Sequence, residues 1–283
     1  ITNPGDEIII PSPYWVSYVE LVKMAGGKPI ILETKEKDNF QIDPEKLKEL
    51  VNEKTKAILI NTPNNPTGTV YSDDTLIDIS NIAYDNDMFI VSDEIYESLL
   101  YDSKHKSIVT LNKKIKDKTI IINGVSKAYA MTGWRIGYLA CNEKLAETIT
   151  NIQSHATSNP NTIAQYASVK ALNLDKKIIK DMVDTFEKRR NYMYKKINEI
   201  DKLSCKKPKG AFYMMINIEK IIGTKINGFE INGSMDFANY LLEESLVAVV
   251  PGIGFGADKF VRVSYATDME TIKEGLNRIQ KAL

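Results

Sequence analysis

Three short polar segments each follow an apolar run of the chain, and their side chains suit acid–base chemistry. They are residues 61–68 (NTPNNPTG), 92–96 (SDEIY) and 123–127 (NGVSK). Because ligands of open parallel sheets bind outside the carboxyl ends of the strands, we expect the three segments to meet there. They bring an amide, a carboxylate, a phenol and an amine to one place: Asn65, Asp93, Tyr96 and Lys127.

Lys127 is the candidate for covalent chemistry. A lysine that forms a Schiff base acts first as a nucleophile and later as a proton carrier, so part of its amine must be uncharged near neutral pH. Its place directly after an apolar strand favours a position shielded from water. The alternative is a solvated surface lysine, which is the usual situation of this residue type.

The segment with Lys127 continues as AYAMTGWRIG over residues 128–137. Together with the other two polar segments, it resembles the class-I (fold-type-I) pyridoxal-phosphate-dependent aminotransferases, and among them bacterial aspartate aminotransferases. The similarity extends over nearly the whole chain, from residues 12–18 (SPYWVSY) to residues 261–267 (VRVSYAT). The resemblance implies an enzyme that uses pyridoxal 5'-phosphate (PLP) as its cofactor.

The resemblance also implies roles around the cofactor ring. Lys127 would hold the cofactor, and Asp93 would keep its ring nitrogen protonated so that the ring withdraws electrons. Asn65 and Tyr96 would donate hydrogen bonds to its phenolic oxygen, and Trp15 would lie over its face. Three of these residues also have a structural alternative: Asp93 as a helix N-cap, Asn65 as a turn residue, and Trp15 as core packing.

Two arginines resemble anion ligands of the family. Arg135, with the hydroxyl of Ser126, would bind the cofactor's phosphate, because a planar guanidinium suits a phosphate. Arg262 would grip the substrate's α-carboxylate, while Trp15 and Asn65 would also border the substrate. A structural salt bridge is the alternative for Arg135, and an exposed strand charge is the alternative for Arg262.

Alternating strands and helices must position these side chains. Apolar runs predict strands at residues 8–10, 29–32, 57–60, 88–91 and 119–122, and the stretches between them predict helices at 14–25, 43–52 and 73–86. Apolar runs separated by amphipathic helices indicate a mostly parallel sheet covered on both faces. This agrees with the α/β fold of the PLP-dependent transferases.

A long charged helix over residues 175–200 leads into a second part of the chain. There we expect strands at 211–216, 246–250 and 260–264 and helices at 235–245 and 269–282. The sequence therefore predicts a large PLP-binding domain over residues 1–175, N-terminally incomplete relative to the family, and a smaller α+β domain over residues 176–283.

Composition narrows the partners. The 283 residues include 37 basic and 37 acidic side chains, so no net field favours nucleic acid or an anionic membrane. The only cysteines, Cys141 and Cys205, lack the spacing of a zinc site or a disulfide framework, which favours a reducing cytoplasm and no metal. No apolar run approaches the length of a membrane span. Small molecules are the expected partners.

The expected reaction moves an amino group between an L-amino acid and a 2-oxo acid, with aspartate and 2-oxoglutarate as the pair and a homodimer as the assembly. Aromatic, alanine, kynurenine or prephenate aminotransferases remain alternatives on the same scaffold. The chain begins at Ile1, and family motifs that precede this point, an arm over the substrate and a glycine-rich phosphate loop, are not in the sequence. Weak cofactor binding and poor activity, or a truncated noncatalytic remnant, are therefore also expected possibilities.

Overall fold

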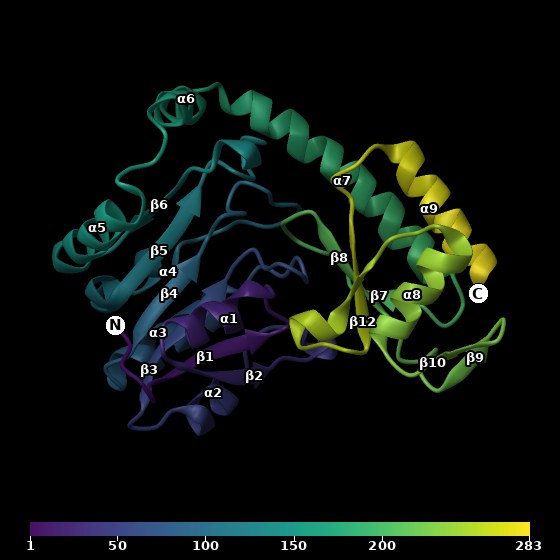
Figure 1. Ribbon diagram of the computed structural model, residues 1–283, viewed down its shortest axis with the longest axis horizontal. Helices are drawn as coiled ribbons and strands as arrows, with labels where there is room; N and C mark the ends of the chain where they lie inside the picture. The colour runs from purple at the N-terminus through teal and green to yellow at the C-terminus, as the bar shows by residue number, and fades with distance from the viewer.

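The structure, a computed structural model, describes residues 1–283 and contains two main sheets. The larger sheet has six strands in the order β2-β1-β3-β4-β5-β6 (Figure 1). Its strands are β1 (Glu7–Ser12), β2 (Lys28–Glu33), β3 (Thr55–Asn61), β4 (Phe89–Asp93), β5 (Thr119–Gly124) and β6 (Gly137–Ala140). The first five are parallel and β6 is antiparallel to β5, so the predicted, mostly parallel sheet is confirmed.

Short helices connect these strands, and side chains cap the first turns of two of them. The helices are α1 (Ser17–Met24), α2 (Pro44–Leu50), α3 (Asp73–Asp85) and α4 (Ile108–Leu111). The side chain of Asp43 accepts from the Glu45 amide at the start of α2, and Ser72 accepts from the Thr75 amide at the start of α3. Buried side chains from β1, β3, β4 and α3 form one hydrophobic cluster, including Ile9, Ile58, Ile60, Leu76, Ile79 and Ile90.

Some predicted boundaries were wrong. The helix expected from residue 14 begins at Ser17, and the Tyr14 amide donates to the carbonyl oxygen of Phe255 in the second part of the chain. Several elements had no prediction, among them β6, α5 (Glu143–Thr157) and α6 (Thr162–Leu172). All four residues of β6 are exposed, so no buried run marks this strand. The helix α5 does carry apolar residues at helical spacing, at Leu145, Ile149 and Ile152, and the prediction missed them.

The helix α7 (Lys176–Glu199) confirms the long charged helix and crosses from the larger sheet to the second part of the chain (Figure 1). There a four-stranded sheet has the order β11-β12-β8-β7. The strands are β7 (Ser204–Cys205), β8 (Tyr213–Asn217), β11 (Val250–Pro251) and β12 (Phe260–Ser264), with a separate hairpin of β9 (Thr224–Ile226) and β10 (Phe229–Ile231). The helices are α8 (Ser234–Ser245) and α9 (Met269–Ala282).

The strand predicted over residues 246–250 was mostly wrong. Leu246 has a φ of 53° and ends α8, and only Val250 and Pro251 pair with β12. The apolar run instead follows the helix as an irregular segment whose partly buried members, Val247 and Val249, pack on the core beneath α8. The division of the chain at residue 175 stays a prediction. None of the helices is both long and apolar enough to cross a bilayer.

A buried arginine holds the junction between α7 and the two sheets. Arg190 is 1% exposed, and its guanidinium donates to the Pro208 carbonyl oxygen (2.9 Å) and the Asp102 carboxylate (3.0 Å). It also lies 4.7 Å from the centre of the Tyr101 ring. These bonds fix the segments on either side of the junction, because a buried guanidinium must keep its donors paired.

The loop after β3 is pressed against the segment that leads into β8. The amides of Lys209 and Gly210 both donate to the carbonyl oxygen of Gly68, each at 2.9 Å. Gly68 has a φ of +68°, and a Cβ there would lie 2.5 Å from the Cβ of Pro208. Only glycine fits this approach, which brings the polar segment at residues 61–68 next to the second sheet.

Gly68→Ala is therefore expected to lower the free energy of unfolding by about 2–4 kcal/mol, since it adds a close contact to an unfavourable backbone angle. Gly223→Ala is the matched control, because Gly223 also has a positive φ (+83°) but nothing within 4 Å of the added methyl. The control should cost about 1 kcal/mol. Urea unfolding measures both, and equal losses in the two variants would contradict the tight packing at Gly68.

Candidate active site

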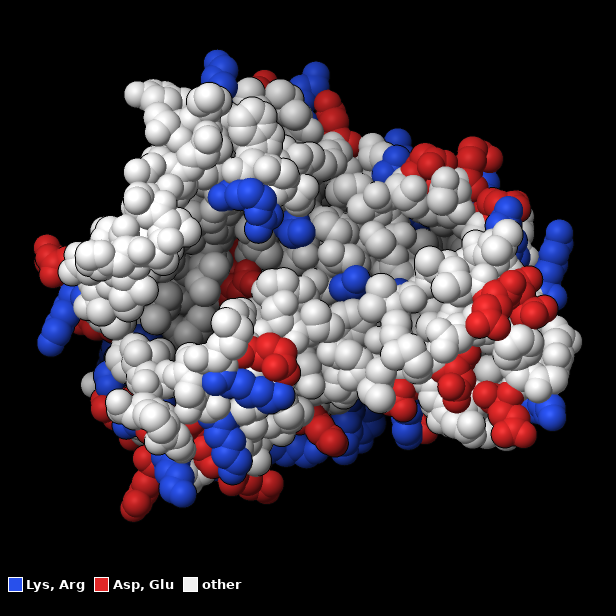
Figure 2. All heavy atoms as spheres, viewed as in Figure 1, with Lys and Arg blue, Asp and Glu red and all other residues white.

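A cavity of about 480 Å³ lies outside the carboxyl ends of β3, β4 and β5. All eight side chains singled out in the sequence line it: Trp15, Asn65, Asp93, Tyr96, Ser126, Lys127, Arg135 and Arg262. Figure 2 shows this face of the molecule hollowed, with acidic atoms deep in the hollow and basic groups at its margin. Seven of the eight come from the larger sheet's part of the chain and one from β12, so the cavity lies where the two sheets meet.

Lys127 follows β5 directly and is half-buried, not solvated. Its Nζ lies 5.9 Å from the centre of the Tyr96 ring and 5.8 Å from that of Phe212. Burial lowers the pKa of this amine, the positive charges of Arg135 and Arg262 lower it further, and the Asp93 carboxylate acts in the opposite direction. The amine is thus shifted toward the uncharged form that a nucleophile or proton carrier needs.

Asp93 ends β4 and points its carboxylate into the cavity. Its Oδ2 accepts a hydrogen bond from the Tyr18 hydroxyl at 2.5 Å, and its Oδ1 accepts from the Ile95 amide at 3.1 Å. Burial raises the pKa of Asp93, while these two hydrogen bonds and the nearby Lys127 lower it. No α-helix follows, so Asp93 caps a tight turn and still directs an oxygen into the site.

Asn65 is fixed from two sides. The backbone N–H of Asn65 donates to Asn61 Oδ1 at 2.7 Å, and Asn61 Nδ2 donates to the Asp93 carbonyl oxygen at 2.9 Å. Its own side-chain Oδ1 accepts from Arg262 Nη1 at 2.8 Å. The side-chain oxygen of Asn65 is therefore engaged by Arg262, and the Nδ2 group is the part left to donate to a ligand.

Arg262 is half-buried, so it is not the exposed strand charge that was the alternative. Its guanidinium lies 4.3 Å from the centre of the Tyr213 ring and 4.8 Å from that of Phe255. Burial lowers the pKa of Arg262, and it has no acidic partner within ion-pair distance. A stacked guanidinium with one nitrogen bonded to Asn65 keeps its other donors for an anion.

Tyr96 lies below Lys127 in the buried turn after β4, and only 3% of it is exposed. Its ring meets Phe212 edge-on at 5.5 Å between centroids, and its hydroxyl lies 3.5 Å from the Tyr213 hydroxyl. Burial raises the pKa of Tyr96, so the phenol stays protonated and acts as a hydrogen-bond donor.

Ser126 and Arg135 both line the cavity. Arg135 has a φ of 56°, and its Nη1 donates to the Thr132 carbonyl oxygen at 2.9 Å. It forms no ion pair, which contradicts the alternative of a structural salt bridge. Trp15 is 38% exposed and packs edge-on against Tyr18, so it is not simple core packing.

Among the other residues that line the cavity, several with polar side chains had no predicted role, including Tyr18, Asn61 and Tyr213. Tyr18 could have been suspected, since it follows Trp15 by three residues and lies in the same segment, residues 12–18, that carries the family resemblance. Asn61 lies inside a polar segment that was already singled out. Tyr213 had no signal, because a tyrosine in an apolar strand looks like ordinary core.

Comparison with known proteins gives a consistent result. The family model of aminotransferase class I and II matches residues 1–279. The aspartate aminotransferase of Bacillus subtilis (strain 168) is 48% identical over 282 residues, which cover 99% of this chain and 71% of that protein.

Solved structures agree with the sequence match. The aspartate aminotransferase from Rhizobium meliloti superposes with a TM-score of 0.96 at 39% identity, covering 100% of this chain and 71% of that one. The aromatic aminotransferase from Pyrococcus horikoshii OT3 superposes with a TM-score of 0.93 at 38% identity, covering 99% and 73% of the two chains.

Tyr18→Phe should destabilise the protein in a pH-dependent way. The Tyr18 hydrogen bond lowers the pKa of Asp93, so its loss raises that pKa further above the unfolded value. A raised carboxyl pKa favours folding only at acidic pH, and this contribution disappears as the pH rises through the folded pKa. The variant should therefore be about 1–3 kcal/mol less stable at pH 7 and closer to the unchanged protein at acidic pH.

Urea unfolding at both pH values checks this expectation. Tyr14→Phe is the matched control, because the Tyr14 hydroxyl makes no hydrogen bond and the residue directly precedes the cavity residue Trp15. A loss in Tyr18→Phe that is the same at both pH values would show that the hydroxyl does not act through the charge of Asp93.

Proposed function

The chain belongs to the class I and II aminotransferase family and is an aminotransferase; on this basis we propose that it uses PLP to move an amino group from aspartate to 2-oxoglutarate. The observation that carries the proposal is the half-buried Lys127, whose amine pKa is lowered and which shares one cavity with the half-buried Asp93 carboxylate. The two groups stand at the ends of neighbouring strands, β4 and β5.

The donors in the cavity fit PLP. The family implies this cofactor, and the cavity offers a carboxylate for its ring nitrogen, hydrogen-bond donors for its oxygen and an arginine without an acidic partner for its phosphate. Asp93 would hold the ring nitrogen, Asn65 and Tyr96 the phenolic oxygen, and Ser126 with Arg135 the phosphate. When bound, the cofactor supplies an electron sink for the bonds at the substrate's α-carbon.

Asp93 suits its proposed partner because its carboxylate is already oriented. Two hydrogen bonds, from Tyr18 and from the Ile95 amide, leave it little freedom to rotate. A buried carboxylate also keeps a strong interaction with a cationic ring nitrogen, since little water competes. The burial that raises the pKa of Asp93 is thus offset when a positive group binds beside it.

Arg262 is proposed to bind the substrate's α-carboxylate. The rings of Tyr213 and Phe255 hold its guanidinium flat, and the bond to Asn65 fixes its rotation. This orients the remaining N–H groups toward the cavity as a fork for two carboxylate oxygens. The substrate's α-carbon would then lie between Arg262 and Lys127, which both line the cavity.

Lys127 is proposed to move the proton. With its pKa lowered, the free amine can take a proton from the substrate's α-carbon and return it later in the same turnover. Trp15, at the cavity wall, would limit the water that reaches this amine.

The choice of aspartate and 2-oxoglutarate is supported by the relatives named as aspartate aminotransferases. An aromatic amino acid is the second candidate, because a solved aromatic aminotransferase resembles this chain in fold and sequence almost as closely as the aspartate aminotransferase from Rhizobium meliloti does. Rates with aspartate and phenylalanine, each with 2-oxoglutarate, separate the two. A higher kcat/KM with phenylalanine would replace aspartate in the proposal.

Two further parts of the proposal concern the setting of the enzyme. The free cysteines Cys141 and Cys205 support a reducing, cytoplasmic location. The apolar side chains of Ile163, Tyr166 and Val169 are all exposed on α6, which supports a homodimer that covers part of them. Sedimentation of the purified protein tests the assembly.

Lys127→Ala is expected to lower kcat by about 10³-fold or more, because both covalent attachment and proton transfer are lost. It should also abolish the near-visible absorbance band that PLP gives when bound to a lysine. Lys220→Ala is the control, since Lys220 is exposed and forms no ion pair. Activity and an absorbance band that survive in Lys127→Ala would overturn the proposed function.

Arg262→Lys is expected to raise KM for amino acids by about 10–100-fold, because an ammonium cannot form the two parallel hydrogen bonds of a guanidinium. PLP affinity should change little, since Arg262 is proposed to touch only the substrate. Arg278→Lys, at a surface ion pair with Glu274, is the control. A loss of cofactor binding with an unchanged KM would assign Arg262 to the cofactor instead.

A further inference from the structure

Glu94 carries a buried carboxylate directly behind the active site. It follows Asp93 in the chain, and its side chain is 3% exposed. Successive side chains at a strand end point to opposite sides, so Asp93 reaches into the cavity while Glu94 reaches away from it. The proposed mechanism does not use Glu94, yet a buried carboxylate needs hydrogen-bond donors to be tolerated.

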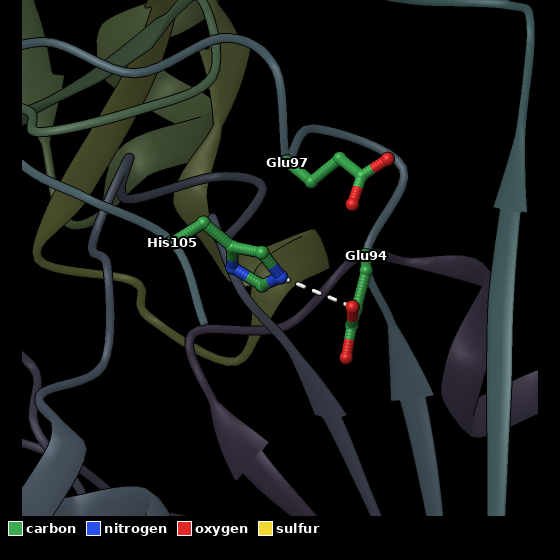
Figure 3. Close-up of side chains that lie close together, drawn as sticks. All are labelled: Glu94, Glu97 and His105. Carbon is green, nitrogen blue, oxygen red and sulfur yellow. Dashed lines mark hydrogen bonds and ion pairs between the residues drawn. The ribbon is translucent and has the colours of Figure 1, made fainter. Parts of the chain in front are cut away.

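Three side chains supply those donors. Ser92 Oγ and Ser107 Oγ both donate to Glu94 Oε1, at 3.0 Å and 2.8 Å. His105 Nε2 donates to Glu94 Oε2 at 3.0 Å, and the imidazole is itself 8% exposed. Figure 3 shows the His105 ring directed at Glu94. Two of the three donors come from the segment before α4, eleven and thirteen residues farther along the chain.

Glu97 lies near the same pair (Figure 3). Its carboxylate and the atoms of Glu94 and His105 are all within 4.8 Å of one another, the closeness of ligands in a cation site. The direct hydrogen bond between His105 and Glu94 already explains why these two meet. The group is therefore better described as a charge-assisted hydrogen-bond network around Glu94.

The segment that carries His105 is itself anchored, so it can hold Glu94 in place. Leu100 pairs with Gly210, and the Tyr101 amide donates to the Lys209 carbonyl oxygen at 2.8 Å. Asp102 is bonded to the buried Arg190 at 3.0 Å. Residues 100–107 thus form a fixed segment, bonded at one end to residues 209–210, which precede β8, and at the other end to Glu94.

Resting on the proposed function, we propose that Glu94 and His105 are positioning residues that hold Asp93 against the cofactor's ring nitrogen. They act through the turn after β4. The Glu94 amide donates to the Ile122 carbonyl oxygen, and the Glu94 carbonyl oxygen accepts from the Glu97 amide at 2.9 Å. The same turn presents the Ile95 amide that binds Asp93 Oδ1. If the Glu94 side chain is released, the peptide that carries Asp93 loses its support.

Charge gives a second reason for the network. After burial, the nearby Glu94 carboxylate is one of the causes that raise the pKa of Asp93. Donors bonded to Glu94 draw its charge away from Asp93, and the His105 N–H is the one that comes from a titratable side chain. Loss of this donor leaves a less compensated carboxylate beside Asp93, which raises the Asp93 pKa further and leaves less of Asp93 ionised to pair with the ring nitrogen.

The test measures the PLP dissociation constant by quenching of the intrinsic fluorescence, to which the cavity residue Trp15 contributes. His105→Leu removes the donor, and the expected result is about tenfold weaker binding or more. His105→Gln keeps an N–H group at similar reach and should bind within about threefold of the unchanged protein. If His105→Leu does not fold, Ser107→Ala removes a smaller donor and should weaken binding by about threefold.

Glu7→Gln is the matched control. Glu7 is also a buried carboxylate, bonded to Lys28 (3.0 Å) and Asn52 (2.9 Å), but it lies at the opposite end of the same sheet. It should lose stability without losing PLP affinity. If His105→Leu binds PLP as tightly as the Glu7→Gln control, this inference is overturned while the proposed function stands. Where His105→Leu does not fold, the same comparison is made with Ser107→Ala. Failure of the unchanged protein to bind PLP would instead refute the proposed function together with this inference.

Discussion

The half-buried carboxylate of Asp93 is the constraint on which the rest of the site depends. Burial makes this carboxylate costly to ionise and so raises its pKa. The surrounding residues act against that cost. Tyr18 and the Ile95 amide donate to its oxygens, and Lys127 stands close enough for its charge to lower the Asp93 pKa. Burial also lowers the pKa of Lys127, so the hydrogen bonds favour the Asp93 anion while burial favours the free Lys127 amine beside it.

The two sheets are joined where the site needs them to meet. Gly68 lets the segment at residues 61–68 approach Pro208, and the bond from Arg262 to Asn65 crosses the same gap at 2.8 Å. Arg190 stabilises the same junction through its hydrogen bonds to the Pro208 carbonyl oxygen and the Asp102 carboxylate. The proposed substrate-carboxylate ligand lies on β12, and most of the proposed cofactor ligands lie at or just after the carboxyl ends of β3, β4 and β5. This joint therefore sets the distance between cofactor and substrate.

Much of the fold could be predicted because burial leaves a pattern in the sequence. The five parallel strands are apolar runs, and α7 and α9 carry apolar residues at helical spacing, so their positions were expected within a few residues. The exposed strand β6 carries no such pattern, whereas α5 carries apolar residues at helical spacing that the prediction missed. The run at residues 246–250 misled for the opposite reason. It is apolar because Val247 and Val249 pack on the core, although most of it pairs with no strand.

The sequence by itself determined which groups are available: a lysine, a carboxylate, an amide and a phenol directly after apolar strands, within motifs that resemble one family. Those residues are close to the strand ends, so local pattern and the rule for parallel sheets were enough to gather them. Tertiary structure alone decided what surrounds each group. Tyr18 and Asp93 are 75 residues apart, and Asn65 and Arg262 are 197 apart. Contacts of that kind depend on strand order, register and the joint between the sheets, which no local pattern of residues encodes.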